Sequence, residues 1–258
     1  MESMFCCPLC SQPLTREEHT YRCPNRHSYD ISKEGYTYLL PVNRKNSAAP
    51  GDDKGMAAAR RDFLSKEYYS PLLNTLCNEI STLAGDAPVL LDTGCGEGYY
   101  TAGIDISKFI LRSAAKRSRD IEFAVASSYH LPVADESIHL LLNCFSPLAA
   151  DEFRRVLKPG GAFLYVVPAA DHLWEMKQVL YDEPYRNEEK LTPYEGFRYE
   201  EVIPVDAQIT LDSQEDIHNL FQMTPYYWKT SKEGAARLAA LEQLTTRISF
   251  RIHVFRKA

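Results

Sequence analysis

Apolar residues recur at helical spacing in the part of the chain that precedes residue 84. Between about residues 56 and 83 they occupy positions three or four apart: Phe63, Leu64, Leu72, Leu73, Leu76 and Ile80. This spacing places them on one face of a helix. Pro71 lies within the run and cannot donate the hydrogen bond that a continuous helix needs. We therefore expect two helices here instead of one.

Short, continuous apolar runs follow and are separated by turn residues or helical segments. They cover residues 89–91, 103–107, 123–128, 138–143 and 162–167, and residues 155–161 end a helix before the last run. Continuous apolar runs are typical of strands that are buried on both faces. Strands that alternate with helices predict an α/β domain with a parallel sheet.

The first of these runs leads directly into a glycine-rich turn that contains Gly94, Gly96 and Gly98. Glycine lets the backbone approach a ligand closely, as it does after the first strand of nucleotide-binding sheets. The spacing G-x-G-x-G alone is weak evidence. Asp105 strengthens it, because an acid at the end of the second run can accept hydrogen bonds from ribose hydroxyls. The alternative is that Asp105 caps a helix that starts near Ser107.

Four of the seven cysteines lie within the first 23 residues. Cys7, Cys10, Cys23 and His27 have the spacing C-x2-C-x12-C-x3-H, which suits a tetrahedral zinc ion. Four protein ligands leave no position for water, so such an ion is structural. Cys6 could replace Cys7, but only Cys7 gives the two-residue gap to Cys10. The remaining alternative is a set of unligated cysteines in a disordered tail.

Charge is distributed unevenly along the chain. Residues 1–61 carry a net charge of +2 and the other residues carry −8, within a total of −6. A negative total argues against non-specific coating of nucleic acid. The difference indicates a basic head on an acidic body, although chance also produces such differences. Because no apolar run could span a membrane and no signal-peptide pattern is present, we expect a cytoplasmic protein.

Basic and aromatic residues are interleaved in the head: Arg16, Tyr21, Arg22, Arg26, Tyr29, Tyr36 and Tyr38. Arginine can bind phosphate while aromatic rings stack under unpaired bases, which is how proteins hold single-stranded RNA loops. The alternative is that the tyrosines pack the zinc module onto its neighbour, and we expect this of at least half of them. Residues 43–54 are polar, contain Pro50 and Gly51, and indicate a linker.

The ordered strands and the glycine turn resemble the class I S-adenosylmethionine-dependent methyltransferases, whose Rossmann-like α/β fold has a seven-stranded, mostly parallel sheet. Within that superfamily the chain resembles the RlmA family of 23S rRNA (guanine-N1)-methyltransferases over almost its whole length. The motifs that carry this resemblance are the zinc pattern, K-E-G-Y at 33–36, L-L-P at 39–41, P-G-D at 50–52, A-R-R-D-F-L at 59–64, G-C-G-E-G-Y-Y-T at 94–101, and Q-M-T-P at 222–225 with Trp228. The most specific element is the fusion of this zinc pattern to this turn.

The resemblance implies three parts: a zinc-binding RNA-recognition module at 1–42, a linker with helices at 43–83 and a methyltransferase domain at 84–258. It implies structural zinc on Cys7, Cys10, Cys23 and His27, and S-adenosylmethionine as the cofactor. The residues expected around the cofactor are Tyr69, Gly94, Gly96, Glu97, Gly98, Asp105 and His172. Tyr69 could instead belong to the core, and His172 could be a surface residue. The implied substrate is a guanine in a 23S rRNA hairpin, and a homodimer is left open.

One interval departs from the family pattern. Asp105 lies nine residues after Gly96, whereas about 20 residues usually separate these positions and include a helix. Since a crossover between parallel strands needs about a dozen residues, the first two strands are not expected both to take their usual places. A deletion, a gap in the sequence as recorded, or a variant without this helix would each give this spacing. We favour a deletion or a gap, because the motifs on both sides are intact.

The chemistry requires little from the protein beyond positioning. Methyl transfer from a sulfonium is an in-line displacement, and the proton on guanine N1 must leave. Asn143 is the candidate for positioning the target, since it ends the fourth strand, where such folds meet their substrates. No catalytic base is assigned. One methionine and three aromatic residues near the C-terminal end could line the target base or belong to the core: Met223, Tyr226, Tyr227 and Trp228.

Two other functions remain open from the sequence. The chain could methylate a small molecule and carry the zinc module as an accessory, in which case activity would not depend on RNA. It could also be an inactive zinc-containing RNA-binding protein on a degenerate methyltransferase scaffold. The shortened interval before Asp105 is the best support for this second alternative, and failure to bind the cofactor would favour it.

Overall fold

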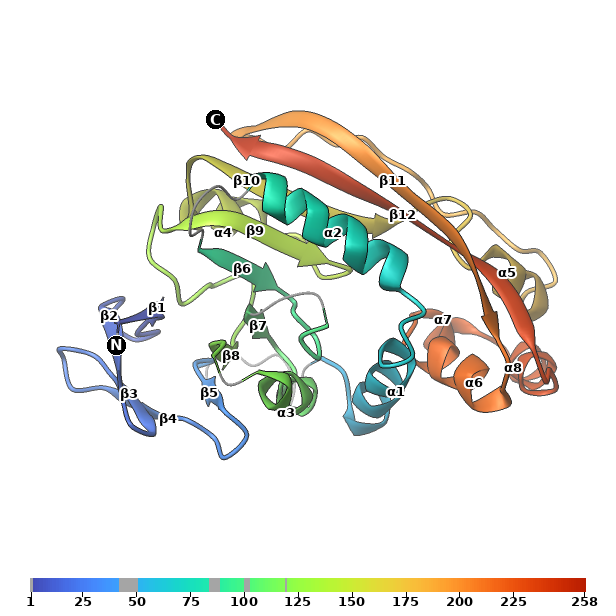
Figure 1. The fold of residues 1–258 in the computed structure, drawn as a ribbon, viewed down its shortest axis with the longest axis horizontal. Coiled ribbons are helices and arrows are strands. Elements are labelled where there is room, and N and C mark those ends of the chain that lie inside the picture. Colours follow the sequence, from blue (N-terminus) through green and yellow to red (C-terminus); the bar gives the residue numbers. More distant parts are fainter. Residues whose placement is uncertain (1, 42–50, 84–88, 100–102, 119) are drawn as a thin grey trace.

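The computed structural model describes residues 2–41, 51–83, 89–99, 103–118 and 120–258. Most of the expected linker at 43–54 therefore lies outside the described residues. Within the described parts, the chain forms a small sheet at the N-terminus and a large mixed sheet with helices on both faces (Figure 1). No helix in these described parts has the length and apolar character to cross a membrane.

The strands are β1 (Glu2–Cys6), β2 (Pro13–Glu17), β3 (Thr20–Arg22), β4 (Ser28–Asp30), β5 (Tyr36–Tyr38), β6 (Leu90–Thr93), β7 (Gly103–Asp105), β8 (Phe123–Val125), β9 (Ile138–Cys144), β10 (Leu157–Pro168), β11 (Phe197–Leu211) and β12 (Leu244–Lys257). The helices are α1 (Lys54–Leu64), α2 (Ser70–Leu83), α3 (Lys108–Arg117), α4 (Ala150–Val156), α5 (Trp174–Leu180), α6 (Gln214–Gln222), α7 (Tyr226–Lys229) and α8 (Lys232–Ala239).

The large sheet has the order β11-β12-β10-β9-β6-β7-β8-β5. β12 runs antiparallel to both of its neighbours, and the other pairs are parallel. The seven strands from β11 to β8 give the mostly parallel sheet that the sequence predicts. β5 adds an eighth strand, contributed by the first 42 residues, and pairs with β8.

The expectation that the first two strands could not both take their places is wrong. β6 and β7 pair in parallel, with Asp92 opposite Gly103 and Thr93 opposite Ile104. The described part of their connection, residues 94–99, forms turns and no helix. The short connection is long enough because β7 begins opposite Asp92, near the end of β6. The chain therefore has to run back along only one or two residues of β6 before the two strands pair. Gly103 permits this close pairing, since a side chain there would overlap the carbonyl oxygen of Asp92.

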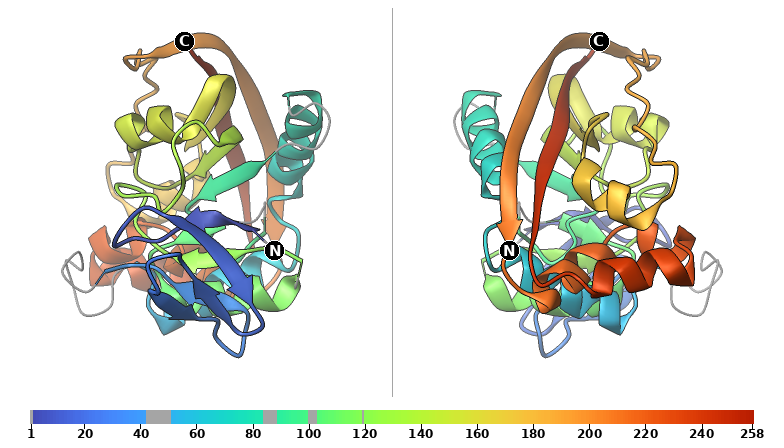
Figure 2. Two further views of the ribbon diagram at one scale, coloured as in Figure 1. Left: turned by 90° about the vertical axis from the view of Figure 1, so that its left-hand side faces the viewer. Right: turned by 90° about the vertical axis from the view of Figure 1, so that its right-hand side faces the viewer.

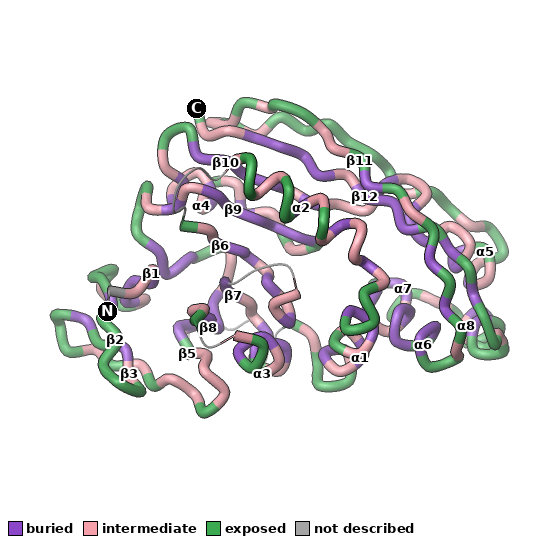
Figure 3. Tube along the Cα trace, in the orientation of Figure 1, coloured by how far each residue is buried: buried purple, intermediate pink, exposed green. Residues whose placement is uncertain are grey.

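The two expected N-terminal helices are present as α1 and α2. The break between them falls at residues 65–69, and Pro71 lies in the first turn of α2, where its missing N–H costs no hydrogen bond. Leu72 and Leu76 of α2 are buried against one face of the large sheet, in a cluster with Leu140 and Leu164. The outward side of α2 is exposed (Figure 3).

The opposite face of the sheet is covered by α4 and by the N-terminal module. Phe153 of α4 packs with Leu141 and Phe163, which point away from the α2 side because side chains alternate along a strand. Phe5 and Leu14 of the module belong to the same buried cluster. The zinc module is therefore packed into the core of the methyltransferase domain and does not extend freely from it (Figure 2).

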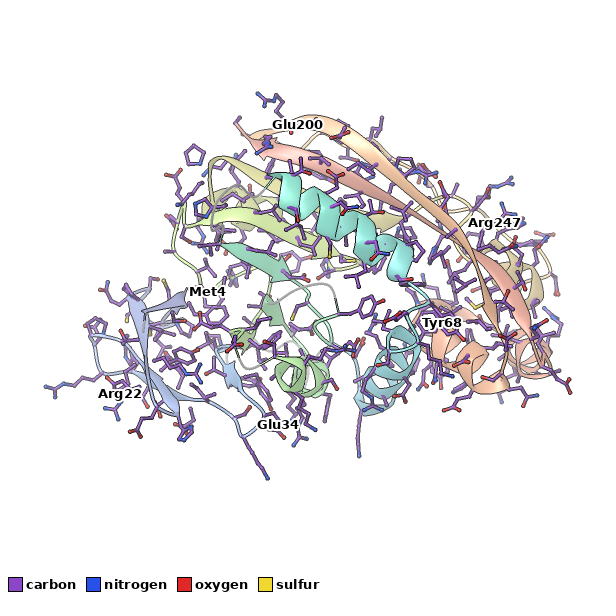
Figure 4. The ribbon with its side chains drawn as sticks, viewed as in Figure 1. Met4, Arg22, Glu34, Tyr68, Glu200 and Arg247 are labelled. Carbon is purple, nitrogen blue, oxygen red and sulfur yellow. The ribbon has the colours of Figure 1, made fainter. Side chains whose placement is uncertain are left out.

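Hydrogen bonds reinforce this docking. The carboxylate of Glu122 accepts from the backbone N–H of Met4 at 3.0 Å and from the hydroxyl of Tyr21 at 2.7 Å. The N–H of Cys6 donates to the carbonyl of Pro132 at 2.7 Å. Met4 accordingly lies where the module meets the large sheet, while Arg22 projects from its outer side (Figure 4).

Candidate metal centre and cofactor site

The four predicted zinc ligands converge at one point. Sγ of Cys10 and Sγ of Cys23 are 3.7 Å apart, and Nδ1 of His27 lies 3.4 Å from Sγ of Cys7 and of Cys23. All four ligand atoms lie within 4.8 Å of one another. A tetrahedral zinc ion with Zn–S bonds of about 2.3 Å requires sulfur atoms about 3.8 Å apart, so these residues fit the metal.

Tight turns bring the ligands together. The N–H of Ser11 donates to the carbonyl of Cys7, and the N–H of Arg26 donates to the carbonyl of Cys23, which closes one turn around each ligand pair. The backbone N–H of Gln12 lowers the pKa of the Cys10 thiol to about 6 and so favours the thiolate that binds zinc. Cys6 lies outside the cluster, so the choice of Cys7 agrees with the geometry.

The basic and aromatic residues of the module divide into two groups. Tyr21 is buried against Glu122, and the hydroxyl of Tyr29 lies 3.0 Å from Sγ of Cys7, so both tyrosines serve packing. Three arginines are exposed: Arg16, Arg22 and Arg26. Acidic side chains lie among them: Arg22 is 3.2 Å from Glu17, and residues 1–42 carry four Lys and Arg against five Asp and Glu. The module contains little exposed aromatic area beyond Tyr38.

The glycine turn lies at the carboxyl ends of β6, β7 and β9. Gly94, Gly96 and Gly98 have φ values of 148°, 57° and 72°, in the region that favours glycine. A side chain on Gly94 would overlap Ser146, which follows β9, so the turn and that loop are in direct contact. A compact, glycine-rich backbone after the first strand is what a nucleoside-binding turn requires.

Asp105 faces this turn from the end of β7. Its carboxylate accepts from the N–H of Gly96 at 3.1 Å and from the N–H of Ser107 at 2.7 Å. Each oxygen keeps a second lone pair that can accept a ribose hydroxyl. Burial raises the pKa of Asp105 to about 6. Ser107 is the N-cap residue of α3 and its side chain makes no capping hydrogen bond, so the bond from its N–H to Asp105 also supports the start of that helix.

Asp92 is a further buried acid that the sequence interpretation missed. It is fully buried at the end of β6, and no described residue donates a hydrogen bond to either of its carboxylate oxygens. Burial and the nearby charge of Asp105 raise its pKa well above the ordinary value. An orphaned buried acid beside a glycine turn fits a site that awaits a polar ligand. In the sequence, the feature that could have identified Asp92 as a site residue is its position directly before Thr93 and Gly94.

Asn143 is fully buried and lies beside the same turn. Its Nδ2 donates to Oγ1 of Thr93 at 3.0 Å and to the carbonyl of Pro147 at 3.2 Å. No described residue donates to its Oδ1. Asn143 therefore shapes the loop after β9 and leaves one acceptor next to the glycine turn.

Glu97 has a different environment from the glycines beside it. Both of its carboxylate oxygens accept from Nη2 of Arg117, at 2.8 and 2.9 Å. Burial raises its pKa, and the Arg117 guanidinium opposes that rise. Its side chain is thus engaged with α3, and its backbone is the part that remains for a ligand.

Tyr69 and His172 meet in an aromatic cluster with Phe250. The ring centroids of His172 and Phe250 are 4.6 Å apart, and those of Tyr69 and Phe250 are 5.1 Å apart. His172 is buried, so it is not a surface residue. Burial lowers its pKa to about 3, which keeps the ring neutral, and Nδ1 accepts from the N–H of Ser249. A neutral ring does not repel a cationic ligand.

The C-terminal aromatic residues belong mainly to the core. Met223 and Tyr226 are buried in the α2-side cluster, and Tyr227 packs against it. Trp228 on α7 is 66% exposed, so it is the one member of this group that remains accessible.

The strand order, the glycine turn and the acid after β7 together define a class I methyltransferase domain. A family model described as a methyltransferase domain matches residues 91–165, and one described as the N-terminal zinc ribbon of RlmA matches residues 5–48. The chain thus joins a zinc ribbon to a methyltransferase, as the sequence indicates.

Three proteins of similar sequence identify the family within the methyltransferases more specifically. The "23S rRNA (guanine(748)-N(1))-methyltransferase" of Streptomyces fradiae is 30% identical, covering 95% of each chain. Proteins of Micromonospora griseorubida and Bacillus subtilis, whose names provisionally give a 23S rRNA (guanine-N1)-methyltransferase, are 36% and 31% identical. They cover 66% and 93% of this chain, and the alignments span 67% and 92% of those proteins.

The chain belongs to the 23S rRNA (guanine-N1)-methyltransferase family. It is an S-adenosylmethionine-dependent methyltransferase with a structural zinc ion. Neither the small-molecule methyltransferase nor the inactive RNA-binding protein is favoured by these relatives.

Proposed function

We propose that this chain transfers a methyl group from S-adenosylmethionine to N1 of a guanine in a hairpin loop of 23S rRNA. The observation that carries the proposal is the docking of a zinc ribbon into the core of a class I methyltransferase domain. A fixed RNA-binding head sets the orientation of an RNA relative to the cofactor edge of the sheet. The named activity of the relatives supports the same substrate.

Residues at the cofactor edge have distinct proposed roles. Gly94, Gly96, Glu97 and Gly98 hold the cofactor through backbone atoms, and Asp105 accepts its ribose hydroxyls. Tyr69 and His172, which pack with Phe250 in the aromatic cluster, contact the other side of the cofactor. The buried acceptors on Asp92 and Asn143 remain available to N–H groups of the cofactor or of the target base.

The reaction needs orientation more than acid or base strength. S-adenosylmethionine supplies an activated methyl carbon, whose bond to sulfur breaks as the bond to N1 forms. The protein holds the guanine in line with that bond, and the N1 proton leaves. Since N1 is paired in duplex RNA, the target must be unpaired, which favours a loop or an extruded base.

The zinc module is proposed to bind the RNA backbone. Arg16, Arg22 and Arg26 are exposed there and can contact phosphates. We place the protein in the cytoplasm, where ribosomal RNA is made and assembled in bacteria, and we leave a homodimer as an untested alternative to a monomer.

Methyl transfer to RNA tests the proposal directly. Purified, zinc-loaded protein is incubated with methyl-labelled S-adenosylmethionine and unmodified 23S rRNA made by transcription in vitro. We expect labelled 1-methylguanosine after nuclease digestion, and a reverse-transcription stop at one position, because a methyl group on N1 blocks base pairing. Absence of label in the RNA from protein that binds the cofactor would refute the proposed substrate.

A further inference from the structure

Phe145 is an apolar side chain that lies open to solvent at the cofactor edge. It directly follows β9, whose residues are buried or nearly so, and it is itself 42% exposed. Full burial of a phenylalanine would contribute about 1.5–3 kcal/mol, much of which is not gained here. A single exposed ring is common on protein surfaces, so exposure alone assigns no role.

The backbone of Phe145 is also strained. Its φ value is 55°, in the left-handed region that costs a residue with a side chain about 1–2 kcal/mol. The surrounding loop enforces this conformation. The N–H of Phe145 donates to the carbonyl of Val166 at 3.2 Å, and the hydroxyl of Ser146 donates to the carbonyl of Thr93 at 2.9 Å. A strained residue that its neighbours hold in place indicates a functional position.

The ring of Phe145 packs against an aromatic neighbour of the core. Its centroid lies 5.3 Å from that of Phe250, a fully buried residue that also packs against Tyr69 and His172. Phe145 therefore continues this aromatic cluster out to the surface. Its loop contacts the glycine turn through Ser146, so the exposed ring lies close to that turn.

We infer that Phe145 is the stacking platform for the guanine that is methylated, an inference that rests on the proposed function. A base taken out of an RNA stack loses its neighbours, and an aromatic ring can replace one of them for about 1–3 kcal/mol. Once N1 has given up its proton to the solvent, the electron pair that takes the methyl group lies in the plane of the base. A ring on the face of the guanine therefore fixes the plane of the base without blocking the approach to N1.

Replacement of the ring tests this inference. Phe145→Leu keeps an apolar side chain of similar size and the same backbone strain but removes the aromatic face, while Phe145→Tyr keeps that face. With transcribed 23S rRNA as substrate, we expect kcat/KM for the RNA to fall roughly 10- to 100-fold in Phe145→Leu. We expect Phe145→Tyr to stay within about threefold of the wild type, since the stacking face is retained.

Cofactor binding separates this inference from the proposed function. Calorimetric affinity for S-adenosylmethionine should be unchanged in both variants. Unchanged kcat/KM in Phe145→Leu would overturn the platform, and so would equal losses in the leucine and tyrosine variants with intact cofactor binding. A wild-type protein that binds the cofactor but does not methylate the RNA would instead refute the proposed function, and the platform with it.

Discussion

Asp92 and Asp105 lie at the ends of the adjacent strands β6 and β7, and their carboxylates differ in the hydrogen bonds that they accept. Asp105 receives two backbone N–H groups, which partly compensate for burial, and its pKa is raised only to about 6. Asp92 receives no hydrogen bond from any described residue, and its pKa is raised further. With a pKa of about 6, Asp105 is mainly in its carboxylate form at neutral pH.

Loss of the Asp105 carboxylate should weaken cofactor binding. A hydrogen bond to a charged group contributes about 1.5–3 kcal/mol, so Asp105→Asn should lower the affinity for S-adenosylmethionine roughly 10- to 100-fold at pH 7.5. Calorimetric titration of the two proteins measures this difference. An affinity that the substitution leaves unchanged would remove Asp105 from the cofactor site.

The same carboxylate predicts a dependence on pH. Because its pKa is about 6, Asp105 becomes protonated as the pH falls from 7.5 to 5.5, and the affinity of the wild type should fall with it. The charged or titratable groups that act on it are Asp52, Arg60 and Asp92. Asp105→Asn should show a flatter profile over this range, and parallel profiles for both proteins would contradict the assignment.

At the level of elements, the zinc ribbon and the edge of the large sheet form one packed unit. β5 extends the sheet beyond β8, and Glu122 joins β1 and β3 to the domain through Met4 and Tyr21. The zinc ligands were predictable because they lie close together in sequence. The docking was not, because Glu122 is more than 100 residues from both of its partners and nothing in local spacing pairs them.

The hydrogen bond between Tyr21 and Glu122 should stabilise the docked arrangement. Tyr21→Phe leaves the buried ring and removes the hydroxyl, so we expect the free energy of unfolding to fall by about 1–2 kcal/mol. Urea unfolding of zinc-loaded protein provides the measurement. Tyr129→Phe, at a tyrosine that is 55% exposed, is the matched control and should change stability by less than about 0.5 kcal/mol. Equal effects of both substitutions would indicate that the bond contributes nothing.

Zinc removal should unfold the ribbon selectively. The module is small, and its loops are held by four ligands, so most of its stability should come from the metal. After chelation we expect backbone amides of residues 5–31 to exchange with solvent rapidly, while those of β9 stay protected. Hydrogen exchange followed by mass spectrometry resolves the two regions. Retained protection in the ribbon would mean that docking alone holds it.

For the whole molecule, the sequence predicted the fold class and the first strands of the large sheet better than the connections between them. Periodicity identified the two N-terminal helices and the five strands from β6 to β10, because each pattern is local. β11 and β12 were missed as the long antiparallel pair. Most of β11 is exposed or half exposed, and in β12, which is largely buried, polar and charged residues interrupt the apolar positions. The pairing of β6 with β7 was excluded wrongly, because the length of a usual crossover was applied to a three-residue strand that starts beside its neighbour.

The candidate site was predicted in a similar, partial way. Spacing identified the zinc ligands, and the glycine turn with Asp105 followed from its place after a strand. Phe145 could not be singled out, because its importance lies in a left-handed backbone and an exposed ring that only the folded chain shows. Asp92 was visible in the sequence, but its lack of hydrogen-bond partners was not.

The distribution of charge over the molecule predicts where RNA binds. Replacing Arg16, Arg22 and Arg26 by alanine should weaken binding to 23S rRNA. The slope of log affinity against log salt concentration should become shallower by about 0.7 for each phosphate that the protein no longer neutralises. Affinity for S-adenosylmethionine should not change. Electrophoretic or filter-binding assays at several salt concentrations give the RNA affinity and its salt dependence.

A matched triple substitution elsewhere controls for total charge. Arg154, Lys190 and Arg198 are cations of the methyltransferase domain with side chains 38%, 64% and 73% exposed. Their replacement by alanine removes the same charge and should affect RNA affinity less than the triple substitution in the zinc module. The opposite order would place the RNA on the body of the protein instead of on the zinc ribbon.

The central claim is that the edge formed by β6, β7 and β9 binds S-adenosylmethionine even though only nine residues, 94–102, connect the first two strands. Calorimetric titration of the cofactor into folded, zinc-loaded protein of this sequence, with its mass verified, tests that claim most directly. We predict one binding site per chain, which Asp105→Ala abolishes. Absence of binding by the folded wild type would mean that the missing helix is indispensable and that the chain is at most an RNA-binding protein.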